Sequence, residues 1–205
     1  METTITVRPA AHDDIPDLAG VLGRAFHDDA IWAWLVPDAD RRVRLIDGYM
    51  EVLLRKLYFR LPGRHVSTTS TRAGVAMWVE PDCWRVPILR ALPAAPGMIR
   101  IFGLRTLARL GGFLSAIEKH HPKEPHWYLE GLGTDPPHQR TGVGSALMQP
   151  ILDRCDREGL PAYLETQKLE NVAYYRRHGF EVREELDLPK DGPHVWLMWR
   201  EPRSE

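Results

Sequence analysis

Cysteine is scarce in this chain of 205 residues, which contains only Cys83 and Cys155. Two cysteines cannot build a disulfide framework, and neither lies in a spacing that pairs metal-ligating cysteines. Long apolar runs are also missing, because charged residues interrupt every hydrophobic stretch before it reaches the length of a membrane span. The opening Met-Glu-Thr-Thr-Ile lacks the basic and apolar regions of a secretory signal peptide. These absences favour a cytoplasmic protein without a membrane partner.

An excess of charge of either sign is absent as well. The chain has 27 Lys and Arg residues against 28 Asp and Glu residues, which gives a formal net charge of -1. Such a balance provides no general attraction to nucleic acid, so we expect no nucleic-acid partner. The 43% hydrophobic content is ordinary for a globular protein, and the length suits a single domain over residues 1–205.

Helical and strand periodicities alternate along the chain and predict an α/β fold with a mixed sheet. We expect strands at residues 5–8, 65–69, 73–79, 127–134, 162–166, 182–188 and 195–199. We expect helices at residues 15–26, 41–60, 98–119, 142–158 and 170–178, the third being either continuous or broken at Gly111 and Gly112. A turn near Thr71 and Arg72 would join the second and third strands. Residues 81–96 are rich in proline and receive no assignment.

The predicted helix over residues 98–119 has an unusual charge pattern. From residue 98 to residue 117 it contains Arg100, Arg105 and Arg109 but no acidic residue. One interpretation is a helix that binds an anion or lies on a membrane surface. The other is a lid helix whose arginines are solvated.

The sequence Gln139-Arg140-Thr141-Gly142-Val143-Gly144 lies between a predicted strand and a predicted helix. Two glycines one residue apart let the backbone approach a ligand closely. The N–H groups of the first helical turn have no intrahelical acceptors and can bind an anion. Arg140 adds a cation, so a diphosphate would suit this loop. By itself, the loop also fits a glycine-rich helix start that serves only as a turn.

Two other nucleotide-binding motifs fit this loop poorly. A P-loop needs Lys and then Ser or Thr after its last glycine, but Gly144 is followed by Ser145 and Ala146. A dinucleotide fingerprint that begins at Gly142 needs a third glycine where Leu147 stands. Both motifs are therefore excluded.

The residues around the loop extend the pattern. In order along the chain they are Asp135-Pro136, the Gln-x-x-Gly-x-Gly loop, a helix, a strand, Asn171, Tyr175 and Gly179-Phe180. This succession resembles the acetyl-CoA core of the GNAT superfamily, which would occupy about residues 126–180. The segments 123–129 and 171–180 are similar in particular to puromycin N-acetyltransferase and its bacterial relatives.

The resemblance implies a function and a fold. The sheet would be mostly antiparallel, with about six to seven strands flanked by helices, and splayed at the cofactor site. Acetyl-CoA would be the cosubstrate, without a metal, and the acetyl group would pass directly to a primary amine of an antibiotic-like or amino-acid-derived small molecule. The protein would act as a monomer or homodimer. Two alternatives are transfer of another acyl group and a non-catalytic acyl-CoA sensor.

The resemblance also implies the residues of the cofactor site. Residues 132–134 would pair with the pantetheine arm, the loop from Arg140 to Ser145 would hold the pyrophosphate, and Asn171 would contact the arm. Relatives usually have glycine where Arg140 stands. The implied set is Leu132, Gly133, Thr134, Gln139, Arg140, Thr141, Gly142, Val143, Gly144, Ser145, Asn171 and Tyr175.

Three residues are candidates for proton transfer. Tyr175 falls where the family has its general acid, and a tyrosine hydroxyl is suited to protonating a thiolate; the alternative is a tyrosine packed in the core. Glu130 lies in an otherwise apolar strand, where burial would raise its pKa toward that of a useful base; the alternative is a carboxylate paired with an arginine. Glu165, on the next strand, would also reach the acceptor if the register allows it.

Histidines and aromatic residues complete the candidates. No recognised metal-ligand spacing joins the histidines, so we expect no metal site, although His121 or His126 could relay a proton. The aromatic side chains could line an acceptor pocket or pack in the core. The histidines considered are His120, His121, His126 and His138, and the aromatic residues are Phe26, Trp32, Trp34, Trp78 and Trp84.

Overall fold

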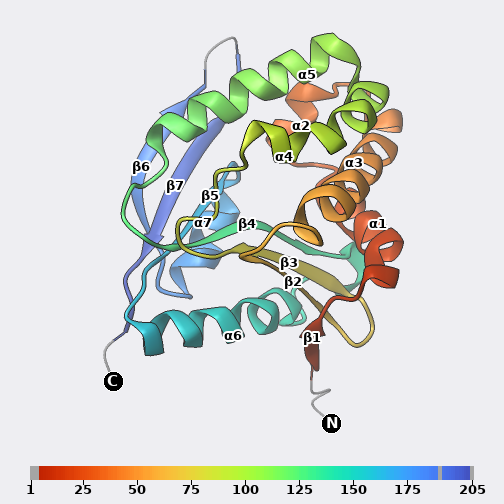
Figure 1. The fold of residues 1–205 in the computed structure, drawn as a ribbon. Helices are drawn as coiled ribbons and strands as arrows, with labels where there is room; N and C mark the ends of the chain where they lie inside the picture. The colour runs from red at the N-terminus through yellow and green to blue at the C-terminus, as the bar shows by residue number, and fades with distance from the viewer. Residues whose placement is uncertain (1–4, 189–190, 204–205) are drawn as a thin grey trace.

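A seven-stranded sheet forms the centre of the protein, seen here in a computed structural model that describes residues 5–188 and 191–203 (Figure 1). The strand order is β1-β2-β3-β4-β5-β7-β6. Every neighbouring pair is antiparallel except β4 and β5, which are parallel. The predicted α/β fold with a mostly antiparallel sheet is confirmed. The strands are β1 (Val7–Pro9), β2 (Arg64–Thr69), β3 (Gly74–Val79), β4 (Trp127–Thr134), β5 (Ala162–Thr166), β6 (Glu181–Asp187) and β7 (His194–Arg200).

Helices cover both faces of this sheet. In Figure 1, α1, α3 and α5 lie on one side of β2, β3 and β4, whereas α6 lies on the other. The helices are α1 (Ile15–Ala25), α2 (Ala30–Leu35), α3 (Ala39–Leu53), α4 (Ile88–Ala91), α5 (Ala95–His120), α6 (Val143–Glu158) and α7 (Leu169–Arg176). Short helical turns are η1 (His12–Asp14), η2 (Leu54–Tyr58), η3 (Leu92–Ala94) and η4 (Pro136–His138).

The central strand β3 divides two hydrophobic cores because successive side chains of a strand point to opposite faces. Val75, Met77 and Val79 pack with α1, α2 and α3. Ala76 and Trp78 pack instead against the face covered by α6. Trp78 is therefore a core residue, as the core-packing interpretation of the aromatic residues predicted.

The sheet changes its geometry in the middle of β4. Leu129 and Gly131 pair with consecutive residues of β3, so Glu130 is the extra residue of a β-bulge. The parallel ladder to β5 ends at the pair Leu129–Leu164. Beyond that pair, β4 continues without a strand partner on its β5 side. The sheet is therefore splayed where the predicted cofactor site begins.

Helix α5 is broken at a different glycine from the predicted one. Gly103 has φ 68° and ψ 165°, a conformation open to glycine and costly for other residues. Gly111 and Gly112 lie within the regular helical part that follows. The prediction of a break at those two residues was wrong, because glycine permits a break but only the local backbone path imposes one.

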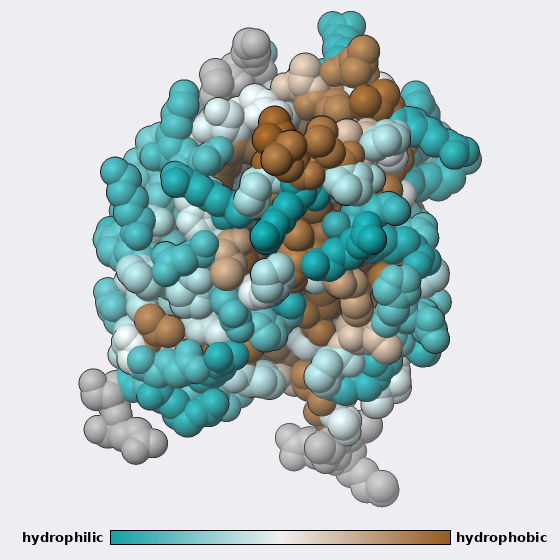
Figure 2. Space-filling view, in the orientation of Figure 1, coloured by the Kyte–Doolittle hydropathy of each residue, from teal (hydrophilic) through white to brown (hydrophobic). Residues whose placement is uncertain are grey.

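The α5 arginines do not form one basic face. Arg109 donates a hydrogen bond to the Trp34 carbonyl at 2.9 Å, and its guanidinium lies 4.3 Å from the centre of the Trp34 ring. Arg100 and Arg105 are exposed. Exposed apolar side chains accompany them on α4 and α5, including Leu89 and Leu104, and Figure 2 shows brown apolar side chains gathered in this region.

The long helix predicted at residues 41–60 is interrupted as well. Its regular part is α3, which ends at Leu53 and continues as the π-helical turn η2. The helix α2 was not predicted, because its sequence Ala-Ile-Trp-Ala-Trp-Leu is too short and too uniformly apolar to show helical periodicity. The predicted turn near Thr71 is confirmed, with Arg72 at φ 56°.

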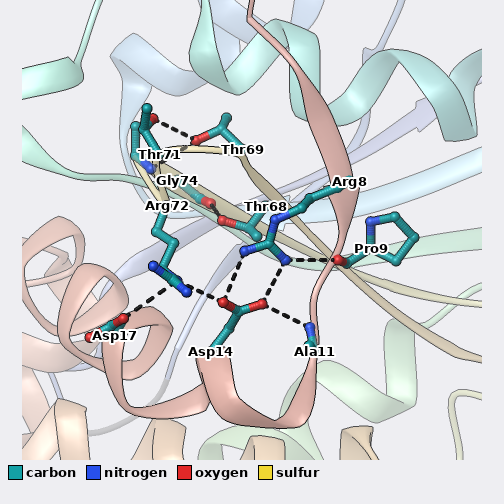
Figure 3. A network of polar contacts seen from close by, with 11 residues as sticks. Arg8, Pro9, Ala11, Asp14, Asp17, Thr68, Thr69, Thr71, Arg72 and Gly74 are labelled. Atoms are coloured by element: carbon teal, nitrogen blue, oxygen red, sulfur yellow. Dashed lines mark hydrogen bonds and ion pairs between the residues drawn. The ribbon is translucent and has the colours of Figure 1, made fainter.

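A buried carboxylate joins β1, α1 and the β2–β3 turn (Figure 3). The Asp14 side chain is only 3% exposed and accepts hydrogen bonds from Arg8 at 2.6 and 2.9 Å and from Arg72 at 2.6 Å. It also accepts one from the Ala11 N–H at 2.8 Å. The hydrogen bond from Arg8, with help from Ala11 and Arg72, lowers the pKa of Asp14 well below its ordinary value.

We expect Asp14→Asn to lower the free energy of unfolding at neutral pH by about 2 kcal/mol, because it removes charge-assisted hydrogen bonds from a buried group. A carboxylate whose pKa is lowered by folding stabilises the protein above its unfolded pKa, and this contribution fades as pH falls. The difference between wild type and variant should therefore shrink below about pH 4. Urea unfolding at several pH values measures it, and a difference independent of pH would contradict this account.

Candidate active site

The glycine loop has the backbone geometry of an anion site. The first intrahelical bond of α6 runs from the Ala146 N–H to the Gly142 carbonyl at 2.9 Å. The N–H groups of the three residues between them donate to no acceptor in the described part of the chain. Gly142 has φ 89° and precedes α6 directly. The start of α6 therefore presents free donors, as the sequence predicted.

Arg140 has φ 62°, in the left-handed region that glycine adopts easily. This conformation explains why a glycine would be natural at this position. An arginine here costs about 1 kcal/mol of backbone strain, and it lines the same hollow as the start of α6. Compared with the glycine that relatives usually have here, Arg140 adds backbone strain but also adds a positive charge.

A cleft of about 990 Å³ lies against the start of α6. It is bordered by the unpaired end of β4, the glycine loop and α7. All of the predicted cofactor residues line it except Thr141, whose hydroxyl donates to the His138 carbonyl at 2.7 Å. The cleft therefore brings together residues 132–145 and 171–175, as the resemblance implied.

Two cations of this cleft were not predicted. Lys168 and Arg177 flank α7 and line the cleft together with Arg140. Three cations in one cleft suit a ligand with several phosphate charges. No local motif marks the two residues, because their position depends on how α7 packs beside the glycine loop.

An ion pair fixes the entry of the glycine loop. Arg24 on α1 binds both oxygens of Asp135, at 2.8 and 3.0 Å. The Asp135 N–H donates to the Ala73 carbonyl at 2.9 Å. The guanidinium of Arg24 lowers the pKa of Asp135, so this carboxylate stays ionised. The loop is thereby held to both α1 and the β2–β3 turn.

A second, smaller pocket of about 200 Å³ adjoins the cleft. Its walls come from α2, α3, α5, β4 and β5. Phe26 and Trp32 line it and also pack in the core beside α1 and α3, so both interpretations of these two aromatic residues stay open. Trp34 and Trp84 do not line it, since Trp34 contacts Arg109 and Trp84 stacks on His121. The two hollows share the wall residues Phe26, Asp29, Leu132, Asn171 and Tyr175.

Glu130 lines this pocket from the β4 bulge, with 30% of its side chain exposed. Its Oε2 accepts a short hydrogen bond from the hydroxyl of Tyr58 and lies 3.4 Å from Arg64. Burial raises the pKa of Glu130, whereas Tyr58 and Arg64 lower it in part. Both sequence-based interpretations are present together, since Glu130 is paired with an arginine and still faces the pocket. Tyr58 itself is placed by the π-helical turn η2.

Tyr175 lies at the boundary of the cleft and the pocket and is 8% exposed. Burial raises the pKa of its hydroxyl, so the hydroxyl stays protonated at neutral pH. It donates to no other residue within 5–188 and 191–203. Beside it, the Asn171 amide donates to the Thr166 hydroxyl at 3.1 Å.

Glu165 also faces the pocket, which settles the register that the sequence left open. Its Oε2 accepts a hydrogen bond from the Tyr128 hydroxyl at 2.7 Å. With Asp29 and Glu130, three carboxylates line this small apolar space. An acceptor that enters it meets an anionic, aromatic environment.

Neither a metal cluster nor a spanning helix occurs in the described residues. No group of three or more His, Cys, Asp and Glu side chains there is placed to hold a metal ion. Within the same residues, no helix is long and apolar enough to cross a membrane.

The fold is that of an α/β protein whose sheet parts beside a helix start with free N–H donors, and its similarity to known proteins identifies the family. The acetyltransferase (GNAT) family matches residues 78–180. An uncharacterized N-acetyltransferase of Schizosaccharomyces pombe is 40% identical over 94% of this chain and 81% of its own. The chain therefore belongs to the GNAT family of acetyltransferases.

Solved structures agree with this membership. A Corynebacterium glutamicum protein described as histone acetyltransferase HPA2 and related acetyltransferase superposes with a TM-score of 0.75 and 28% identity, covering 99% of both chains. A mosquito arylalkylamine N-acetyltransferase like 5b superposes with a TM-score of 0.54 and 15% identity, over 97% of this chain and 100% of its own. The second likeness shows the fold alone.

We expect Arg140→Gly and Arg140→Ala to separate backbone strain from charge. Both variants lose the cation and should bind coenzyme A several-fold more weakly, with a smaller dependence on salt. Only the glycine variant relieves the left-handed backbone, so it should be more stable than the alanine variant by about 1 kcal/mol. Calorimetric titration and thermal unfolding measure these effects. Equal stability of the two variants would show that residue 140 is unstrained.

Proposed function

We propose that the protein transfers an acetyl group from acetyl-CoA to the primary amine of a small cationic molecule. One observation carries this proposal: the cleft and the pocket share Tyr175, Asn171 and Leu132 as walls. A thioester at this boundary would have coenzyme A on one side and an amine on the other. The reacting atoms would then meet next to a protonated tyrosine.

The residues of the cleft fit coenzyme A. The free N–H groups opening α6 and the cations Arg140, Lys168 and Arg177 suit its phosphates. The unpaired edge of β4 offers backbone donors and acceptors to the amide groups of the pantetheine arm. The bound cofactor would supply an activated acetyl thioester.

The chemistry of the pocket suggests the acceptor. Carboxylates among aromatic walls favour an ammonium group, through charge and through cation–π contact. A volume of about 200 Å³ suits a small amine or one side chain. The resemblance to puromycin N-acetyltransferase that the sequence suggested would imply an antibiotic-like or amino-acid-derived amine as the acceptor. The names of the structural neighbours include acceptors of other kinds, such as histones and arylalkylamines.

The mechanism requires three proton transfers, because the amine nitrogen loses two protons and the departing sulfur gains one. Glu130 would take the first proton from the ammonium, since an aliphatic amine is almost fully protonated at neutral pH. The neutral amine would attack the thioester carbon directly, its nitrogen would give the second proton to a carboxylate of the pocket, and Tyr175 would protonate the departing thiolate. One proton must then leave the site once Tyr175 is protonated again. No cysteine lines the cleft or the pocket in the described chain, and burial raises the pKa of the Cys155 thiol to about 12. A covalent acetyl-cysteine step is therefore not proposed.

A panel of amines tests the proposal. Free-thiol release from acetyl-CoA should occur with puromycin, other aminoacyl compounds or arylalkylamines, and much less with a folded histone. Propionyl-CoA and succinyl-CoA, offered with the same amine, test the alternative of another acyl group. Absence of coenzyme A binding in calorimetry would remove the proposal altogether.

Tyr175→Phe separates an enzyme from an acyl-CoA sensor. The hydroxyl makes no hydrogen bond in the described structure, so the variant should fold and bind acetyl-CoA as wild type does. Loss of a general acid should slow transfer by about 100-fold. Steady-state thiol release and calorimetry measure the two quantities. Unchanged transfer would exclude Tyr175 from the mechanism.

Glu130→Gln should slow transfer most between about pH 6 and 8, and less near pH 10, where aliphatic amines lose their proton unaided. Tyr58→Phe provides a matched test. The hydrogen bond from Tyr58 lowers the pKa of Glu130, so its removal should move the acid limb of the pH–rate profile to higher pH. A Glu130→Gln profile with the shape and height of wild type would assign the base to another group.

A further inference from the structure

Glu165 connects the acceptor pocket to a pair of buried histidines. His121 and His126 are 7% and 3% exposed, and their Nε2 atoms lie 3.1 Å apart. On the other side of His121, its Nδ1 lies 3.7 Å from Oε1 of Glu165. The line of groups from the pocket is therefore Glu165, His121 and His126.

The hydrogen-bond partners fix the protons on both rings. Nδ1 of His126 lies 2.6 Å from the Glu124 carbonyl, which only accepts, so this nitrogen carries the hydrogen. Burial lowers the pKa of His126, which keeps the ring neutral and leaves its Nε2 as an acceptor. Nε2 of His121 must then donate to it. A neutral His121 consequently has a lone pair on Nδ1.

This lone pair faces a carboxylate oxygen that has no partner within hydrogen-bond distance in the described residues. The buried hydroxyl of Tyr163, also without a partner there, is the other donor that acts on Glu165. Oε1 of Glu165 is buried and has no hydrogen-bond partner in the described chain, whereas Oε2 is occupied by Tyr128. Two acceptors thus oppose each other across 3.7 Å. A single proton placed between them would satisfy both atoms and form an imidazolium–carboxylate pair.

Acetyl transfer produces one proton that must leave the pocket. An ammonium and a thioester give an amide, a thiol and a proton. The nitrogen loses two protons in the reaction, and the thiolate sulfur accepts only one. A route through the protein would let this proton leave while coenzyme A and the acceptor occupy the cleft and the pocket.

We propose that Glu165 and His121 take up the proton released by acetyl transfer and deliver it to the protein surface. This inference rests on the proposed function of the same site. Glu165 would be the catalytic carboxylate that accepts the second proton of the amine nitrogen, after Glu130 has taken the first, and His121 would be a positioning residue that holds the proton with it. Glu130 has a different setting, because its Oε2 already contacts Tyr58 and Arg64.

The surface lies on the far side of His121. A depression of about 440 Å³ is bordered by His121 and by the indole of Trp84, whose ring lies 3.9 Å from the imidazole. Charged and titratable residues surround Glu165 and His121. Those at the depression are Asp82, Arg85, Glu118, Lys119 and Lys123. Glu124 lies beside His126, Glu130 lines the pocket, and Tyr128 and Tyr163 lie on the sheet.

Glu165→Gln tests the proposal with little risk to the fold. The amide can donate an N–H to Nδ1 of His121, so it fills the vacant position and should preserve or raise the melting temperature. It cannot accept the proton, so transfer to a reactive amine of the panel should fall by about 100-fold near neutral pH. His121→Asn should alter the pH profile of the rate, whereas His120→Asn, an exposed neighbour paired with Glu184, should not.

Nitrogen NMR of the histidine rings gives a readout independent of activity. At high pH, wild-type His121 should carry its hydrogen on Nε2 and His126 on Nδ1. In Glu165→Gln, whose amide can donate to Nδ1 of His121, the same positions of the ring hydrogens should be kept. A hydrogen on Nδ1 of His121 at high pH would overturn the assignment.

The kinetic outcomes distinguish failure of the proton route from failure of the proposed acetyl transfer. If wild type acetylates amines and Glu165→Gln does so within twofold across the pH range, the proton route is wrong and the proposed function stands. If wild type binds acetyl-CoA but acetylates no amine, the proposed function fails, and the proton route fails with it.

Discussion

The separation of β4 from β5 is the constraint on which the rest of the site depends. Their parallel ladder ends at Leu129 and Leu164, and the sheet then opens instead of continuing. Backbone groups left at such an opening need partners, and an extended ligand arm can provide them. The bulge at Glu130 falls immediately after the last pair. One irregularity of the sheet therefore makes room for a cofactor and presents a carboxylate beside it.

Charge is divided between the two hollows that meet at this opening. The cofactor cleft has Arg140, Lys168 and Arg177 on its walls, whereas the adjoining pocket has Glu130 and Glu165. In the proposed reaction, anionic phosphates and a cationic amine would thus be directed to opposite sides of one boundary. The neutral hydroxyl of Tyr175 lies on that boundary, where charge would develop on a leaving sulfur. Such an arrangement would orient both substrates before any chemistry occurs.

Local irregularities are concentrated around this site. Arg140 has a left-handed backbone, Tyr58 sits in a π-helical turn, and Glu130 sits in a bulge. Such features reduce regular hydrogen bonding and are found at functional sites, where surrounding contacts maintain them. Here the supporting contacts are the Arg24–Asp135 ion pair and the short hydrogen bond from Tyr58 to Glu130.

The amino-acid sequence by itself determined the elements whose signals are local. The glycine loop, the periodic helix α6 and the alternating strands depend on neighbours a few residues apart, so these elements could be predicted, and the motifs that resemble the family lie among them. The tertiary structure alone decided which carboxylates share a pocket, that α5 breaks at Gly103, and that Trp78 is buried on the α6 face. These outcomes depend on strand register and on helix packing between segments distant in the chain. A one-residue change of register would turn the side chains of a strand to the opposite face of the sheet.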